Sequence, residues 1–117
     1  MQHDDKILEI SALARKELPT LKQAFNMDRL VDDYLLIKAP IITNDSNKEW
    51  MWVKVLRWEK QIIEGSLYNT SSKNEHLREG VVVSVDEKDV FDFIIKNEKG
   101  EFIGNETEKY LLSQKER

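Results

Sequence analysis

The stretch that decides the fold spans residues 49–69 and reads EWMWVKVLRWEKQIIEGSLYN. It carries all three tryptophans of the chain, and its apolar residues alternate with others on both sides of a polar pair, Glu59 and Lys60. Alternation of this kind, interrupted by a polar pair, predicts one long β-hairpin with its turn at that pair.

The position of the turn determines which side chains share a face, because successive residues of a strand point to opposite sides. One face is expected to belong to the core and holds Trp50, Trp52, Leu56, Ile63 and Leu67. The other face holds Met51, Val53, Val55 and Tyr68 together with Arg57, Glu64 and Ser66. Trp58, beside the turn, is expected to reach the surface. A strand that is apolar on both faces is central or belongs to a partial barrel, and Gly65, opposite Lys54, is expected to be a bend point.

The N-terminal residues predict a helix that is interrupted at Pro19. Asp4 and Asp5 suit a helix N-terminus, and the apolar residues that follow recur at steps of three and four: Ile7, Ile10, Ala14, Leu18 and Leu21. Proline lacks an amide hydrogen, so the helix must kink at Pro19 or restart with this residue in a first turn. We expect the apolar stripe to pack on a sheet; binding of a partner is the alternative.

The remaining residues predict strands and a final short helix. Strands are expected at 34–42, 81–85, 90–96 and 101–104, and a helix at 108–114. Pro40 cannot donate to a ladder, so the first of these strands is expected to lie at an edge or to finish there. The fold prediction is one α+β domain over residues 1–117. Its N-terminal helix, kinked or split at Pro19, packs on a strongly bent, mostly antiparallel sheet of five to six strands or a partial barrel, and a short C-terminal helix follows.

Composition narrows the functional classes. The chain has 117 residues, no cysteine and a net charge of -4, which excludes a disulfide framework and a cysteine-based zinc site. The acidic balance argues against binding driven by charge to nucleic acid or to an anionic membrane. No secretory signal and no long apolar run is present, so we expect a cytoplasmic protein.

The order of short signatures resembles a bacterial family, the domain of unknown function number 2314. A strand carrying Lys38 is followed by an acidic residue before Met-Trp-Val, here Glu49 and then residues 51–53. An I-x-G-x-L-x-N strand occupies 63–69. The later signatures are Gly80 before a Val-rich strand, the pair Asp92 and Phe93, and Gly104 and Thr107 before the terminal helix.

This sequence departs from the family pattern at four positions. Trp50 stands where the family usually has His, and Ser71 where a proline is common. Phe93 replaces a usual Trp, and Asn105 replaces a second glycine. If the family's His serves a site, this chain has lost it. The resemblance implies a bacterial cytosolic protein, with some members fused to ankyrin-like repeats, and it implies no known reaction.

No catalytic, cofactor or metal motif is predicted. His76 has neighbouring glutamates in a polar segment, a pattern more typical of a solvated loop than of a metal site. Asp92 lies inside an apolar strand, where its carboxylate needs hydrogen bonds or a cation, and a structural salt bridge to Lys38, Lys54 or Arg57 is the expected role. The polar site candidates are Glu49, Asn69 and Asp92. A hydrolase-like or ligand-binding domain would use Glu49 and Asp92, with His76 as a third candidate in the hydrolase-like case.

A protein-interaction role is the preferred functional prediction. The candidate contact residues are Met51, Arg57, Tyr68 and Trp58, because Trp, Tyr, Met and Arg are enriched at interaction hot spots. We expect a non-catalytic, immunity-like or regulatory module whose partner is a basic toxin or enzyme. Nucleic acid and membranes are not expected partners, no cofactor is expected, and the sequence specifies no oligomeric state.

Overall fold

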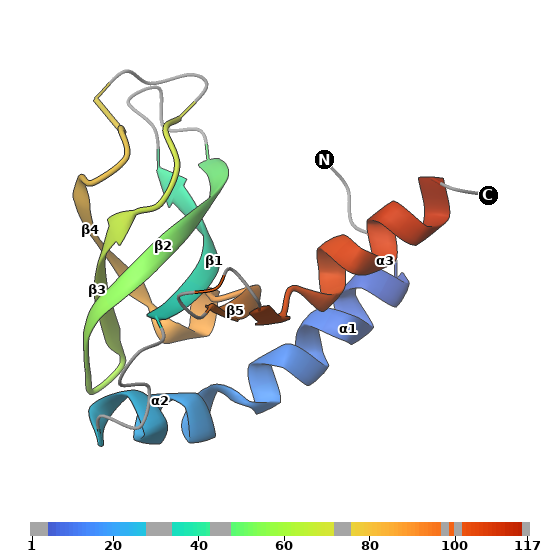
Figure 1. Cartoon of the computed structure of the whole chain (residues 1–117), viewed down its shortest axis with the longest axis horizontal. Helices are drawn as coiled ribbons and strands as arrows, with labels where there is room; N and C mark the ends of the chain where they lie inside the picture. Colours follow the sequence, from blue (N-terminus) through green and yellow to red (C-terminus); the bar gives the residue numbers. More distant parts are fainter. Residues whose placement is uncertain are drawn as a thin grey trace.

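The computed structural model describes residues 5–27, 34–42, 48–71, 76–96, 99 and 102–115 (Figure 1). The helices are α1 (Asp5–Lys16), α2 (Leu18–Asn26) and α3 (Glu106–Lys115), with a short 3-10 turn, η1 (Glu87–Asp89). The strands are β1 (Tyr34–Ile42), β2 (Lys48–Glu59), β3 (Ile62–Leu67), β4 (Val82–Asp86), β5 (Asp92–Lys96) and β6 (Phe102–Gly104). The predicted α+β class is confirmed, because a bent N-terminal helical segment packs on an antiparallel sheet.

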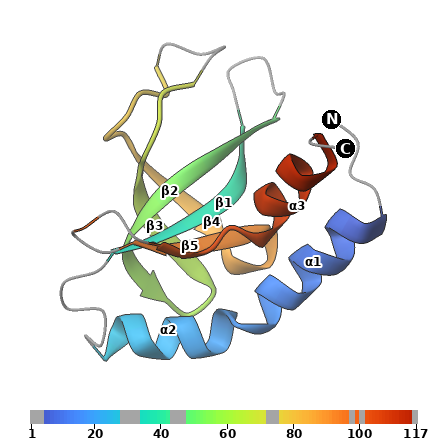
Figure 2. The same ribbon diagram turned by 45° about the vertical axis from the view of Figure 1, so that its right-hand side comes forward.

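The N-terminal helical segment is divided at Pro19, as predicted. α1 ends at Lys16, and α2 begins at Leu18 with the proline in its first turn, where its missing amide hydrogen breaks no helical hydrogen bond. Leu18 and Leu21 of α2 are buried in the main core. Figure 2 shows α2 crossing the end of the β2–β3 hairpin, while α1 and α3 pack on each other beside the sheet.

The six strands form one open sheet in the order β4-β3-β2-β1-β5-β6, with every neighbouring pair antiparallel. β1 is therefore central, which corrects the expectation of an edge strand; the alternative, that the strand is finishing at Pro40, agrees with its end at Ile42. The proline is tolerated because the pairing of β1 with β5 reaches only Lys38, opposite Asp92. Beyond that point β1 pairs with β2 alone, with Pro40 opposite Trp50.

The β2–β3 hairpin forms, but its predicted register is wrong. The turn lies at Lys60 and Gln61, one residue later than predicted, so Trp58 pairs with Ile63. Lys60 has a φ of 52°, the left-handed conformation that such a tight turn needs. Trp58 is 1% exposed and lies in the core rather than at the surface.

A β-bulge between Val55 and Arg57 changes which residues of β2 face the core. Two residues of a bulged strand lie opposite one residue of its partner, so the alternation of side chains shifts by one. Trp58 faces inward on the turn side of the bulge, whereas the inward residues on the other side are Met51, Val53 and Val55. Trp50 and Leu56, which were predicted core residues, are instead exposed, and Trp52 is half-buried. Ile63 and Leu67 are buried as predicted.

Gly65 lies beside this bulge, opposite Val55 rather than opposite Lys54 as predicted. A Cβ atom built on Gly65 would collide with the Lys54 carbonyl oxygen and would lie 2.7 Å from Cγ1 of Val53. Glycine is therefore required here by the close approach of β2 and β3, as is common at bulges.

Gly65→Ala is expected to lower the free energy of unfolding by about 1 to 3 kcal/mol, because the added methyl group must push apart two paired strands. Ser84→Ala is the matched control, since Ser84 is an exposed residue of the same sheet, opposite Glu64. Urea denaturation measures both. Equal midpoints for the two variants would show that the strands can separate at Gly65 without cost.

Candidate functional site

The face of the sheet opposite the core carries a cluster of aromatic and lysine side chains. Alternation along the strands places Tyr34, Lys38, Trp52, Lys54, Tyr68 and Lys96 on this side, which we call the outer face. Lys54 is exposed, and the other five are half-buried. Leu36 points to the same side, lies between Lys54 and Ile94 in the register, and is only 2% exposed. The longer side chains around Leu36 therefore fold over the outer face and cover it.

Each of the three lysines lies over an aromatic ring of another segment of the sheet face: Lys54 and Lys38 over rings of the adjacent strand, and Lys96 of β5 over Tyr68, which follows β3. The ammonium of Lys54 is 5.0 Å from the ring centroid of Tyr34, and that of Lys96 is 5.5 Å from the ring centroid of Tyr68. Lys38 lies 6.0 Å from the ring of Trp52, the residue directly opposite it on β2. These contacts hold the positive charges close to the sheet, in the geometry of cation–π interactions.

Hydrogen bonds connect two tyrosines and a lysine at one place on this face. Lys96 Nζ donates to Tyr68 Oη at 3.3 Å, and the hydroxyl oxygens of Tyr34 and Tyr68 are 3.2 Å apart. The hydrogen bond from Tyr34 lowers the pKa of Tyr68, with help from Lys96, and the same bond raises the pKa of Tyr34. The pKa of Lys96 is raised because its ammonium is bonded to Tyr68. Either hydroxyl can donate in the bond between the tyrosines, and the directions of the two pKa shifts correspond to Tyr34 as the donor, with Tyr68 accepting from both Tyr34 and Lys96.

The outer-face lysines have no carboxylate partner in the described part of the chain. The ion pairs found there involve other cations: Lys6, Lys22, Arg57, Lys88 and Lys109. The protein as a whole has 22 acidic against 18 basic residues. Among the described residues, the outer face therefore gathers three lysines that form no ion pair, while Glu79 is near enough to raise the pKa of Tyr68.

The predicted contact residues do not share one surface. Met51 and Trp58 are 0% and 1% exposed and belong to the core, so their prediction as surface contacts is wrong. The bulge and the shifted turn are the physical reason. Arg57 is exposed and forms an ion pair with Glu59 at 2.9 Å. Tyr68 is half-buried and belongs to the outer-face cluster.

The polar candidates lie in two separate places. Glu49 Oε1 accepts a hydrogen bond from Ser71 Oγ at 2.7 Å, and Asn69 Oδ1 accepts from the Trp52 amide at 3.2 Å. Both bonds lie where the pairing of β2 with β3 ends. His76 is exposed in the connector that follows.

Asp92 is buried and is held by hydrogen bonds rather than by a cation. Its Oδ2 accepts from the Thr107 hydroxyl at 2.6 Å and from the Thr107 amide at 3.1 Å, and its Oδ1 accepts from the Phe93 amide at 2.8 Å. Thr107 lies in the first turn of α3, where free amides and the helix dipole favour a carboxylate. In place of the expected salt bridge to Lys38, Lys54 or Arg57, Asp92 forms hydrogen bonds that connect β5 to α3.

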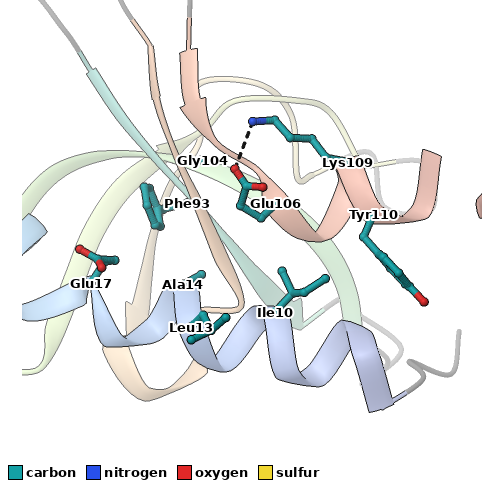
Figure 3. Close-up of a pocket in the computed structure, with 9 residues that line it drawn as sticks. All are labelled: Ile10, Leu13, Ala14, Glu17, Phe93, Gly104, Glu106, Lys109 and Tyr110. Atoms are coloured by element: carbon teal, nitrogen blue, oxygen red, sulfur yellow. Dashed lines mark hydrogen bonds and ion pairs between the residues drawn. The ribbon is translucent and has the colours of Figure 1, made fainter. Parts of the chain in front are cut away.

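An apolar hollow of about 520 Å³ lies between α1, β5 and α3 (Figure 3). Its apolar lining includes Ile10, Leu13, Ala14 and Phe93. Polar groups stand at its rim, where Lys109 forms an ion pair with Glu106 at 3.2 Å. The sequence does not predict this hollow, because it depends on the packing of the two ends of the chain.

No group of three or more His, Cys, Asp or Glu side chains within the described residues is arranged to hold a metal ion. No helix in the same part of the chain is long and apolar enough to cross a membrane.

Comparison with models of known protein families matches residues 4–116 to a family described as "Uncharacterized protein conserved in bacteria (DUF2314)". The chain belongs to this family. No curated protein and no solved structure matches it. In this DUF2314 member Trp50 is 37% exposed and packs on Phe91 with ring centroids 5.1 Å apart.

Sequence reasoning on this DUF2314 chain missed Tyr34 and Lys96, and it considered Lys54 only as a salt-bridge partner of Asp92 and not as part of this cluster. Each is an isolated polar or aromatic residue in an apolar strand, and the three come from three different strands. The alternation of β1 and β5 does place Tyr34 and Lys96 on the side opposite Leu35 and Ile95. Only the register, with Tyr34 opposite Lys96, brings them together.

Asp92→Asn is expected to lower the free energy of unfolding by about 1 to 3 kcal/mol, because an amide nitrogen replaces an acceptor and the charge-assisted bonds to Thr107 are lost. Glu106→Gln is the control, since Glu106 is an exposed acidic residue of the same helical turn. Urea denaturation at neutral pH compares the two variants. If both unfold at the wild-type midpoint, Asp92 does not hold α3 to the sheet.

Tyr34→Phe is expected to raise the pKa of Tyr68 toward its ordinary value of 10.0, because the main donor to the Tyr68 oxygen is removed. Tyr68 then ionises at a higher pH than in the wild type. NMR of isotope-labelled tyrosine rings during alkaline titration follows each phenol separately. Tyr110→Phe should leave the titration of Tyr68 unchanged. The same Tyr68 titration in Tyr34→Phe and wild type would exclude the proposed direction of the hydrogen bond.

Proposed function

We propose that this protein is a non-catalytic protein-interaction module, of the immunity-like or regulatory kind, and that it binds its partner through the outer face. The observation that carries the proposal is the exposure of large apolar side chains on that side of the sheet. Trp50 is 37% exposed, Ile62 is 48% exposed and Val82 is 58% exposed, and all three point away from the core by strand alternation. Leu56 at the bulge is 53% exposed.

Exposed apolar residues on one face of a sheet support a binding role, because contiguous apolar patches on soluble proteins commonly mark interaction sites. Trp52, Tyr34 and Tyr68 add half-buried aromatic rings on the same face. Tryptophan and tyrosine are enriched among the residues that dominate binding energy, since each removes much apolar area from water while losing little side-chain entropy. The outer face therefore combines exposed apolar side chains, aromatic rings and the positive charges of its lysines.

The hydrolase-like alternative receives no support from the placement of its residues. Glu49 is opposite Ile41 on one side of β1, and Asp92 is opposite Lys38 on the other side. Ordinary strand dimensions put the two backbones on the order of 14 Å apart, too far for paired carboxylates to share a proton or a water. Asp92 is also 1% exposed and already bonded to Thr107.

The test compares two double variants that remove similar apolar area from different surfaces. Leu56→Ser with Val82→Ser changes the outer face, where the residues are 53% and 58% exposed. Leu8→Ser with Leu112→Ser changes the helices, where they are 50% and 53% exposed. A partner captured from bacterial lysate is identified, purified and titrated against each protein by calorimetry. The outer-face variant should weaken binding roughly tenfold or more, and the helix variant less than about twofold.

Three results would contradict the proposal. A purified partner that binds the outer-face variant as tightly as the wild type would place the contact elsewhere. A larger loss in the helix variant would move it to α1 and α3. Failure to recover any partner with the cross-linked wild-type chain would remove the reason to assign an interaction role. Circular dichroism of both variants confirms that the fold is retained.

A further inference from the structure

We infer that Tyr34, Lys54, Tyr68 and Lys96 form a receptor for a carboxylate group, and that the group comes from an acidic segment of a protein partner. The inference rests on the proposed function and adds the chemistry that the partner presents. It also differs from the expectation of a basic partner, which followed from the net charge of -4. The charge of the contact surface, rather than that of the whole chain, determines which side chains can be paired there.

The first support is the concentration of hydrogen-bond donors in the cluster. An ammonium group has three N–H donors. Of those on Lys96, one is directed to Tyr68 Oη, and Lys54 is held over the ring of Tyr34 at 5.0 Å. Donors on both lysines are therefore left over for water or a ligand. A carboxylate is the group that uses several donors at once, because it has two oxygens and accepts only.

The second support is that no ion pair to Lys54 or Lys96 is found among the residues that the structure describes. Acidic side chains in this part of the chain pair with other cations. Lys38, over Trp52 on the same face, extends the positive region along β1. A segment with more than one carboxylate matches this row of ammonium groups better than a single small anion does.

The geometry of the rings favours an acidic peptide over a single-stranded nucleic acid. Nonspecific binding of single strands uses open aromatic faces on which bases stack. Here Lys54 lies over one face of the Tyr34 ring and Lys96 over one face of the Tyr68 ring. The tyrosine hydroxyls point toward one another, with oxygens 3.2 Å apart, and present a polar point rather than a stacking platform. The overall negative charge also opposes the long-range attraction of a polyanion.

The test titrates the full, isotope-labelled chain with three probes at low salt. The probes are a short, end-blocked peptide of alternating Glu and Asp, the matching peptide of Gln and Asn, and single-stranded oligothymidylate of the same formal charge; sodium phosphate is a fourth arm. We expect the acidic peptide alone to shift the amide signals of β1, of the end of β3 and of β5. Added salt should weaken its binding, and the pKa of Tyr68 should rise when the peptide binds, because a nearby negative charge disfavours the phenolate.

Variants separate binding by the cluster from attraction by charge alone. Lys54→Met with Lys96→Met should weaken binding of the acidic peptide roughly tenfold or more, because charge-assisted hydrogen bonds are lost. Lys6→Met with Lys16→Met removes the same charge from exposed positions on α1 and should change binding less than about twofold. Lys96→Arg keeps the charge and should retain most of the affinity. Circular dichroism confirms that each variant is folded.

Each other outcome overturns the inference. Equal binding of the amide peptide, or of both lysine double variants, would show that no carboxylate is recognised at the cluster. Tighter binding of oligothymidylate at the same amides would make the surface a nucleic-acid site, and the same shifts with phosphate alone would assign a phosphoryl ligand. If the acidic peptide fails to bind while a protein partner still depends on Leu56 and Val82, this inference fails and the proposed function stands. If the acidic peptide binds at the cluster but no protein partner depends on Leu56 and Val82, the carboxylate receptor stands and the proposed function fails.

Discussion

The β-bulge between Val55 and Arg57 is the constraint on which the rest of the structure depends. It allows Trp58 to face the core on one side of the irregularity and Val53 and Met51 to do so on the other. In a regular strand, Trp58 would lie on the opposite face from Met51 and Val53, so that either Trp58 or the other two would point away from the core. Leaving either set exposed to water would lose about 1.5 to 3 kcal/mol of stability for each large side chain. Gly65 makes the bulge possible, since no side chain fits between β3 and the backbone of β2 at that point.

The bulge shifts the alternation of side chains along β2, and this shift determines which residues lie on the outer face. Because the odd-numbered residues before the bulge are in the core, Trp50, Trp52 and Lys54 must lie on the opposite side. There they meet Lys38 of β1, and Tyr34 and Lys96 where β1 and β5 pair. A surface of aromatic rings and lysines therefore results from the packing demands of the core. The same packing explains why two of the four residues predicted to bind a partner, Met51 and Trp58, are inaccessible.

Features that depend on a short stretch of sequence were predicted correctly. Features that depend on how two segments pack on each other were not. Pro19 divides the helix because it lacks an amide hydrogen. The succession of strands along the chain follows from alternation and polar turns. The hairpin register was not predictable in this way, because β2 is apolar on both sides and a slip by one residue leaves an equally apolar pattern. Asp92 was correctly expected to need partners when buried. That the partner is Thr107, and not a lysine, depends on how β6 directs the chain back to β5.

The outer-face lysines can stabilise the free protein and still be available to a ligand, and relative magnitudes explain how. A cation–π contact at an exposed site contributes about 0.5 to 1 kcal/mol, whereas a hydrogen bond to a charged group contributes about 1.5 to 3 kcal/mol. An ammonium held over Tyr34 or Tyr68 is therefore kept near the sheet and partly ordered, but it is bound less strongly than it would be by a carboxylate. The entropy lost in ordering a lysine side chain, up to about 2 kcal/mol, is already partly spent before a partner arrives. Lysines that were paired internally with acidic residues would have to break those pairs first, so the absence of such partners around Lys54 and Lys96 in the described structure favours a surface that is prepared for an external anion.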